Sequence, residues 1–144
     1  MADSDQAVRL TSTAPTAEVH DVTAVIDGAD ATTLDEMYAA FAAAWDFPAH
    51  FGNNKDAFDD CMRDLDSDGT AEDRLVTVVR NAEQLLADAS DQDFAWFAGS
   101  MAFYQDDYRD RDADEQRDFE LVLVTGKAHR AAVADRWAKA GVDL

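Results

Sequence analysis

The residues best suited to chemistry lie in one stretch, residues 47–65, where an aromatic loop runs directly into an acidic helix. At 100° per residue, four carboxylates fall within one arc of that helix: Asp56, Asp59, Asp60 and Asp64. Apolar side chains, among them Phe58 and Met62, fall within the opposite arc. One face of the helix is therefore expected to join the core, and the other to present carboxylates to a cationic partner.

The loop before this helix is bounded by Pro48 and Gly52. Proline fixes the backbone and glycine permits a sharp turn, so the loop is expected to hold a defined shape. We expect His50 and Phe51 to be displayed beside the carboxylates, where both rings can stack on a partner. Together, the loop and the helix predict a protein-binding surface.

This spacing resembles the barstar family of intracellular inhibitors of secreted, barnase-type ribonucleases. The family pattern is a Pro, two residues later an aromatic pair, then Gly, any residue, Asn, any residue, Asp-Ala, two residues and Asp-Cys. In this chain the pattern is filled without a gap by Pro48, His50-Phe51, Gly52, Asn54, Asp56-Ala57 and Asp60-Cys61. Flanking segments extend the resemblance to about residues 22–126.

The resemblance implies an immunity protein, or antitoxin, that binds its ribonuclease one to one. In this family the second helix and the preceding loop fill the basic active-site cleft, and an Asp carboxylate takes the place of a substrate phosphate. That Asp corresponds to Asp60 here, with Asp56 as a second acidic contact. The whole expected partner-binding set is His50, Phe51, Gly52, Asn54, Asp56, Asp59, Asp60 and Asp64, with Asp106 and Asp107 as further candidates.

His50 stands in place of the first tyrosine of the family's aromatic pair, and two positions of the helix also depart from the family's archetype. Lys55 stands where the archetype has a leucine, and Asp59 stands where it has a tryptophan. Both positions belong to the proposed binding helix, so these changes would alter the partner's contacts. A toxin other than a barnase-type ribonuclease therefore stays open as an alternative.

The net charge of −19 argues against direct binding to nucleic acid and favours a basic protein partner. Asp outnumbers Glu by 25 to 6, an excess larger than one interface needs. Adaptation to high salt would produce the same bias without a binding role. An acidic, salt-adapted domain that has this fold but no ribonuclease inhibition is thus a second alternative.

The sequence predicts a cytoplasmic protein. It contains no apolar run long enough to span a bilayer and no basic segment followed by a hydrophobic stretch at its N-terminus. The single cysteine, Cys61, cannot form an internal disulfide, which agrees with a reducing compartment. We expect no membrane association.

The acidic residues also match parts of two other kinds of site, a calcium-binding loop and an enzyme's paired carboxylates. Residues 64–69 supply four positions of a calcium-binding loop, but Leu75 stands at the twelfth position, where a bidentate Glu is needed. Paired carboxylates on the acidic helix could serve an enzyme, but no His lies within helical reach, and there is no nucleophile or cofactor motif. The sequence therefore predicts no catalysis, no metal and no cofactor.

The alternation of apolar segments predicts an α/β fold, a small three-stranded parallel sheet packed with helices. The expected strands are residues 22–27, 75–79 and 119–124. The expected helices are residues 33–45, 54–65, 81–89, 92–108 and 128–140, with a charged insertion at 110–118. Thr33 and Glu36 predict the cap of the first helix.

Three regions are expected along the chain. Residues 1–20 are rich in Ala, Ser, Thr and Asp and predict a flexible leader. Residues 21–126 would form the barstar-like domain, and residues 127–144 a C-terminal helical extension packed on it. In that extension Val133 and Trp137 are expected to face inward, with Gly141 ending the helix.

Overall fold

The computed structural model describes residues 7–15, 21–48, 51–65, 74–112 and 115–144. Its strands are β1 (Val8–Thr11), β2 (Asp21–Asp27), β3 (Arg74–Arg80) and β4 (Asp118–Val124). Its α-helices are α1 (Leu34–Trp45), α2 (Lys55–Met62), α3 (Asp91–Arg109) and α4 (Arg130–Lys139). Short 3-10 turns lie at Gly28–Asp30, Ala82–Gln84 and Lys127–His129.

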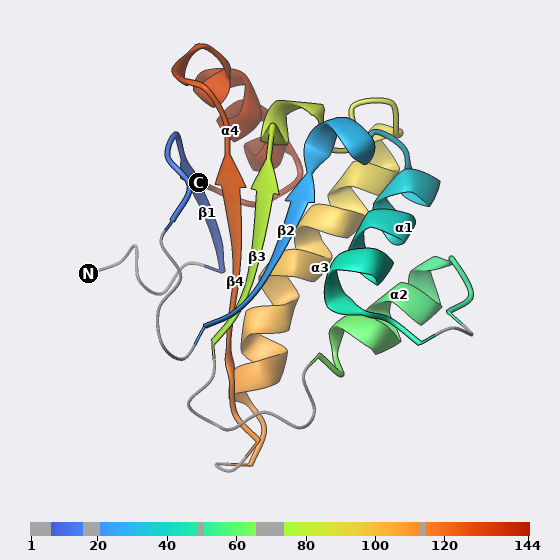
Figure 1. Cartoon of the computed structure of the whole chain (residues 1–144). Coiled ribbons are helices and arrows are strands. Elements are labelled where there is room, and N and C mark those ends of the chain that lie inside the picture. Colours follow the sequence, from blue (N-terminus) through green and yellow to red (C-terminus); the bar gives the residue numbers. More distant parts are fainter. Residues whose placement is uncertain (1–6, 16–20, 49–50, 66–73, 113–114) are drawn as a thin grey trace.

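The strands form one parallel sheet in the order β1-β4-β3-β2 (Figure 1). Val25 pairs with Val78, and Val78 pairs in turn with Val122, so the central strands are in register over their apolar residues. The expected mixed α/β fold with a parallel sheet is confirmed. Strands β2, β3 and β4 can run in the same direction because a helical connection separates β2 from β3 and β3 from β4.

The sheet has four strands, and the expectation of three was wrong. The additional strand, β1, lies within the segment expected to be a flexible leader, and it pairs with β4 through Val8 and Leu121. Val8 is buried in the core and Leu10 packs partly against it. A strand of four residues with only two apolar side chains gives too short an alternation to be recognised from sequence. Residues 1–6 and 16–20 of the expected leader lie outside the described ranges.

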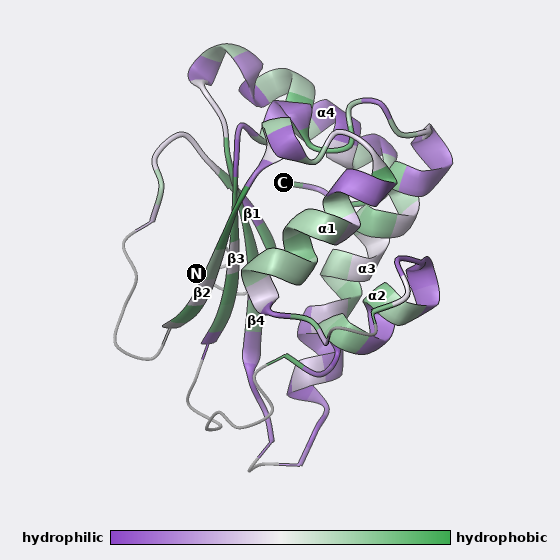
Figure 2. Cartoon of the chain, turned by 45° about the vertical axis from the view of Figure 1, so that its right-hand side comes forward, coloured by the Kyte–Doolittle hydropathy of each residue, from purple (hydrophilic) through white to green (hydrophobic). Residues whose placement is uncertain are grey.

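Helices α1, α2 and α3 cover one face of the sheet (Figure 2). Side chains at alternate strand positions, such as Leu75 and Leu121, point to this face and join Phe41, Phe58 and Phe97 in one core cluster. A buried polar group on the same face, the Thr77 hydroxyl, accepts a hydrogen bond from Trp45 Nε1 at 2.9 Å. The helices therefore contribute aromatic rings to the core that packs on this face of the sheet.

The opposite side of the sheet, which we call the open face, carries no helix in Figure 2. It has a separate, smaller apolar cluster made by Val76, Val78 and Val122. Val25 belongs to the same face by alternation and is 56% exposed. Val25 also borders α1, because it lines a surface pocket together with residues of that helix.

The expected extra helix at the C-terminus is present as α4. Val133 and Trp137 are buried as predicted, and the Trp137 ring lies 5.2 Å from the ring of Phe94. Arg136 donates hydrogen bonds to the carbonyls of Leu85 and Leu86, at 2.7 and 2.6 Å. Helix α4 is thus fixed to the body of the fold by both an apolar and a polar contact.

The expected helix at residues 81–89 was wrong. Only a 3-10 turn, Ala82–Gln84, forms there. Asn81 and Leu86 adopt left-handed backbone conformations, with φ of 49° and 55°, which no α-helix can contain. Leu86 is held in this conformation because its side chain is fully buried and its N–H donates to the carbonyl of Ala31 at 2.8 Å.

The other expected helices occur near their predicted bounds. Helix α1 begins after Thr33, whose hydroxyl accepts from the N–H of Glu36 at 3.1 Å. Helix α3 is one residue longer at each end than the expected 92–108. Helix α2 ends at Met62, and residues 63–65 continue as a turn. None of the helices in the described ranges is long and apolar enough to cross a membrane.

Candidate partner-binding surface

Helix α2 lies at the side of the helical layer farthest from the sheet (Figures 1 and 2). Its position is fixed by Phe58 and Met62, whose side chains are fully buried in the core. Asp56, Asp60 and Asp64 lie on the solvent side and are exposed. The segment therefore has the predicted core face and, opposite it, the predicted carboxylate face.

The loop before α2 is ordered by its own hydrogen bonds. Asn54 is the N-cap of the helix, because its side-chain oxygen accepts from the N–H of Ala57 at 2.8 Å. The amide nitrogen of the same side chain donates to the carbonyl of Gly52 at 3.3 Å. A Cβ atom at Gly52 would lie 3.1 Å from that nitrogen, so a larger residue would press on the cap. Asn54 and Gly52 thus set the start of the helix.

The aromatic residue of the loop that the structure describes, Phe51, packs inward. Its ring centroid lies 5.1 Å from that of Phe47 and 6.1 Å from that of Tyr38, and the side chain is half-buried. Phe51 therefore anchors the loop to the rings beneath it, and its contact with a partner stays a prediction. His50, the other predicted aromatic contact, lies outside the described residues.

Asp59 differs from the other carboxylates of α2 because it faces α3. Its Oδ1 accepts a hydrogen bond from the Tyr104 hydroxyl at 2.9 Å, and its Oδ2 lies 3.5 Å from the guanidinium of Arg63. Burial raises the pKa of Tyr104, and the carboxylate of Asp59 raises it further. The oxygens of Asp59 are thus engaged within the chain.

Two cations join α2 to α3, one at each end of α2. Lys55 Nζ lies 2.8 Å from Asp93 Oδ1 and 5.3 Å from the ring centroid of Trp96. At the other end, the guanidinium of Arg63 lies 3.2 Å from Asp107 and 5.9 Å from the ring of Phe103. Each cation therefore contacts one carboxylate and one aromatic ring of α3. The two contacts fix the rotation of α2 about its own axis.

Tyr108 of α3 forms hydrogen bonds with two backbone groups at the end of α2 and in the turn after it. The buried Tyr108 hydroxyl donates to the carbonyl of Met62 and accepts from the N–H of Leu65 at 2.9 Å. Burial raises the pKa of Tyr108 to about 12. Arg111 stacks on the Tyr108 ring at 4.2 Å and also donates to the carbonyl of Arg63. Both ends of the acidic helix are thus held by hydrogen bonds.

Three carboxylates on the surface remain without such partners. Among the described residues, none forms a hydrogen bond or an ion pair with the side chains of Asp56, Asp60 or Asp64. The nearby carboxylate of Asp107, in contrast, is paired with both Arg63 and Arg111, and its side chain is only 15% exposed. We call Asp56, Asp60 and Asp64 the acidic row.

The two further candidates for partner binding, Asp106 and Asp107, both lie on α3 but differ in their surroundings. Asp106 is exposed, whereas Asp107 is the carboxylate that holds Arg63 and Arg111. Sequence reasoning missed the roles of Lys55, Arg63 and Phe103, which border the acidic row. The sequence of α3 could have indicated these contacts, because it places a carboxylate and an aromatic ring on one helix face twice. Asp93 is three residues from Trp96, and Phe103 is four residues from Asp107.

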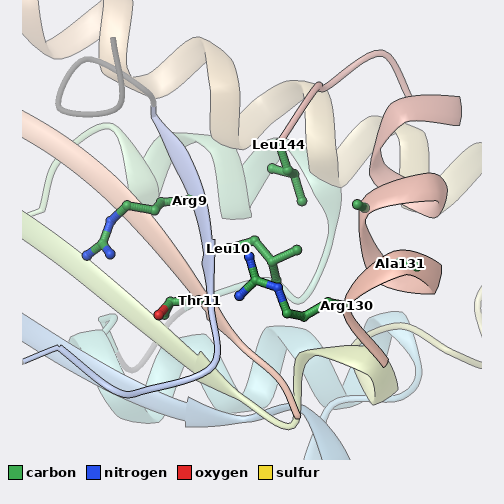
Figure 3. A pocket seen from close by; sticks show the side chains of 7 residues that line it. Arg9, Leu10, Thr11, Arg130, Ala131 and Leu144 are labelled. Carbon is green, nitrogen blue, oxygen red and sulfur yellow. The ribbon is translucent and has the colours of Figure 1, made fainter. Parts of the chain in front are cut away.

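A cavity of about 530 Å³ lies elsewhere, between β1 and α4 (Figure 3). It is lined by Arg9, Leu10, Thr11, Arg130, Ala131, Ala134 and Leu144. In this view the guanidinium groups of Arg9 and Arg130 lie on opposite sides of β1, and each has a partner of its own, Glu120 at 3.5 Å and Ser12 at 3.2 Å. The cavity lacks the converging polar groups of a ligand site.

A metal site finds no support in the part of the chain that the structure describes, where no three metal-binding side chains meet. The calcium-loop pattern at residues 64–69 falls mostly on residues 66–69, outside the described ranges. Within the described residues, the feature best suited to binding a partner is therefore the acidic row on α2 and the turn after it.

Comparison with known proteins adds one finding. A family model described as Barstar (barnase inhibitor) matches residues 22–124, which run from β2 to the end of β4 and include the whole acidic row. No curated protein and no solved structure matches the chain. Strand β1 and helix α4 lie outside the matched range.

Proposed function

The chain belongs to the Barstar (barnase inhibitor) family, and from that premise we propose that it inhibits a secreted, barnase-type ribonuclease inside the cell that produces the enzyme. In this proposal α2 and the loop before it enter the basic active-site cleft. The chain acts by occupying the cleft and performs no catalysis of its own. The complex contains one inhibitor and one enzyme.

The observation that supports this proposal is the unpaired state of the acidic row. Asp59 accepts a hydrogen bond from Tyr104, and Asp93 and Asp107 form ion pairs with Lys55 and Arg63. Asp60, the central residue of the row, has no internal partner among the described residues. A carboxylate that the fold leaves free can accept charge-assisted hydrogen bonds from Arg, Lys or His side chains of an enzyme that binds phosphates.

Preorganisation strengthens the same argument. The N-cap at Asn54, the Lys55 and Arg63 contacts and the Tyr108 hydrogen bonds hold α2 before any partner arrives. Less conformational entropy is then lost on binding, so more of the interaction free energy appears as affinity. The net charge of −19 also accelerates encounter with a basic enzyme.

The proposal is tested by titrating the chain into a barnase-type ribonuclease that is cleaving RNA. Cleavage should fall to background at one equivalent, because each inhibitor blocks one cleft. Loss of activity with far less than one equivalent would indicate catalytic inactivation instead. Full activity in the presence of excess chain would contradict inhibition of this enzyme class.

The second candidate for the partner is a basic toxin of another class, and two residues favour it. Lys55 and Asp59 both contact α3, and both are charged at positions where the family's archetype has apolar side chains. An enzyme that depends on apolar contacts at these positions would bind this chain weakly. This candidate would be supported if the chain inhibited a basic toxin of another class and left barnase-type enzymes fully active when added in excess.

A further inference from the structure

One aromatic side chain of the helical layer remains at the surface. Phe103 of α3 is 49% exposed, whereas its neighbours on α3, Met101 and Tyr104, are fully buried. Within the described ranges, the large hydrophobic side chains that are exposed are Phe103 and Val25. Val25 lies in β2, at the edge of the sheet, whereas Phe103 lies in α3.

Phe103 is continuous with the acidic row through Arg63. The Arg63 guanidinium lies 5.9 Å from the Phe103 ring, and Arg63 follows Asp60 by three residues, close to one turn of helix. Asp59 and Asp107 both pair with Arg63, at 3.5 and 3.2 Å, which neutralises its charge. A basic partner can therefore approach across Arg63 without meeting an uncompensated positive charge.

We propose that the partner-binding surface extends from the acidic row across Arg63 to Phe103, and that the partner carries an apolar patch beside its basic cleft. This inference rests on the proposed function, because the occupant is the same basic enzyme. The acidic row binds the cations of the cleft, and Phe103 packs against the apolar patch beside it. Binding would remove from water the half of the ring that folding leaves exposed.

The arrangement matches the general anatomy of tight protein interfaces. Charged groups steer and orient the partner, while aromatic anchors supply much of the affinity and slow dissociation. Phe103 is well suited to be such an anchor because its ring already contacts Arg63 and lies 6.1 Å from the ring of Tyr104. Little additional ordering is needed when a partner covers it.

The test compares Phe103→Ala with Val25→Ala in binding to a catalytically disabled barnase-type ribonuclease. Each variant removes one exposed apolar side chain, and thermal unfolding checks that both remain folded. We expect Phe103→Ala to raise Kd about tenfold or more, mainly through faster dissociation. Val25→Ala should leave Kd within about twofold of wild type.

Two further measurements separate a direct apolar contact from an indirect effect through Arg63. Phe103→Leu keeps an apolar side chain and should recover most of the affinity lost in Phe103→Ala. Raising the salt concentration should weaken the wild type and Phe103→Ala by the same factor, since an apolar contact is not screened. A deficit that shrinks with salt, or that Phe103→Leu does not reduce, would overturn the apolar-anchor inference.

The failure of this inference is distinguishable from the failure of the proposed function. If wild type binds tightly and Asp60→Ala does not, but Phe103→Ala behaves like Val25→Ala, the extension to Phe103 is wrong and the inhibitor function stands. If wild type itself does not bind the ribonuclease, both are overturned for that enzyme class.

Discussion

The Tyr104 hydroxyl donates a hydrogen bond to Asp59 at 2.9 Å, although Asp59 lies on the helix face that the sequence predicts to be free for a partner. This contact distinguishes Asp59, which serves the fold, from the acidic row, whose three carboxylates have no partner within the described ranges. It also links the buried interior of α3 to the binding surface, because the Tyr104 side chain is fully buried.

The first prediction concerns stability at alkaline pH. The pKa values of Tyr104 and Tyr108 are raised in the folded chain above the ordinary value of 10.0, chiefly by burial, and that of Tyr108 reaches about 12. The folded chain therefore keeps protons that the unfolded chain has lost, so stability is full below pH 10 and falls as the pH rises toward 12.

Urea unfolding at pH 9, 10 and 11 measures this effect. The free energy of unfolding of wild type should decline across the series, and the decline should be shallower in Tyr104→Phe and in Tyr108→Phe. At neutral pH, Tyr108→Phe should cost about 1–3 kcal/mol because it leaves buried backbone groups unpaired. Identical pH slopes in wild type and both variants would contradict the account.

The second prediction concerns Lys55. The hydrogen bond from Lys55 lowers the pKa of Asp93, and the positive charge of Lys55 lowers it further. In Lys55→Met the pKa of Asp93 should rise toward its ordinary value, as followed by carboxyl-carbon NMR. The stability that Asp93 contributes is present above its unfolded pKa and lost as the pH falls through the folded value, so wild type should lose more stability below pH 4 than the variant.

Lys139→Met is the matched control for Lys55→Met. Lys139 also pairs with a carboxylate, Asp135, at 3.1 Å, but on the exposed surface of α4. This variant should leave the Asp93 pKa unchanged. An equal shift in both variants would mean that the change is a general effect of net charge and that Lys55 has no specific role.

The third prediction concerns the N-cap of α2. Asn54→Ala removes the acceptor of the Ala57 N–H and should lower the free energy of unfolding by about 0.5–2 kcal/mol. Ser90→Ala removes the equivalent cap of α3, where Ser90 accepts from Asp93 at 3.1 Å, and should cost a similar amount. Only Asn54→Ala should also weaken partner binding, because Asp56 and Asp60 of the acidic row lie on α2 and not on α3. Equal affinities of the two variants would refute a role for the cap in binding.

The fourth prediction tests the turn after β2. A Cβ at Gly28 would lie 2.4 Å from the carbonyl oxygen of Asn81, a backbone atom that cannot move aside cheaply. Gly28→Ala should therefore destabilise the chain by about 1–3 kcal/mol in chemical denaturation. Gly99→Ala, in α3 with nothing within 4 Å of the added atom, should stabilise by about 0.5–1 kcal/mol. Equal effects of the two substitutions would contradict the packing at Gly28.

Much of this architecture could be predicted from local patterns. The apolar run from Leu75 to Val79 forms most of β3, and Thr33 caps α1 as its position indicates. These features depend on neighbouring residues, so a sequence reports them directly. The periodicity of α2 likewise revealed which of its residues join the core.

The errors arose where tertiary contacts decide local structure. Strand β1 exists because β4 offers an edge for Val8 to Thr11 to pair with, and its own four residues carry little signal. The segment after Asn81 has helical composition, but the left-handed Leu86 ends the helical path because its backbone bonds to Ala31. In the same way, Asp59 and Asp60 could not be told apart until the position of Tyr104 on α3 was known.

The central claim is that the acidic row binds a basic ribonuclease through Asp60, and isothermal titration tests it most directly. Wild type, Asp60→Ala and the control Asp88→Ala would be titrated against a catalytically disabled barnase-type ribonuclease. Asp88 is also exposed but lies before α3, away from the acidic row. We expect tight one-to-one binding by wild type and Asp88→Ala, and a loss of at least about a hundredfold in Asp60→Ala with folding unchanged. Equal affinities of Asp60→Ala and Asp88→Ala would contradict the claim.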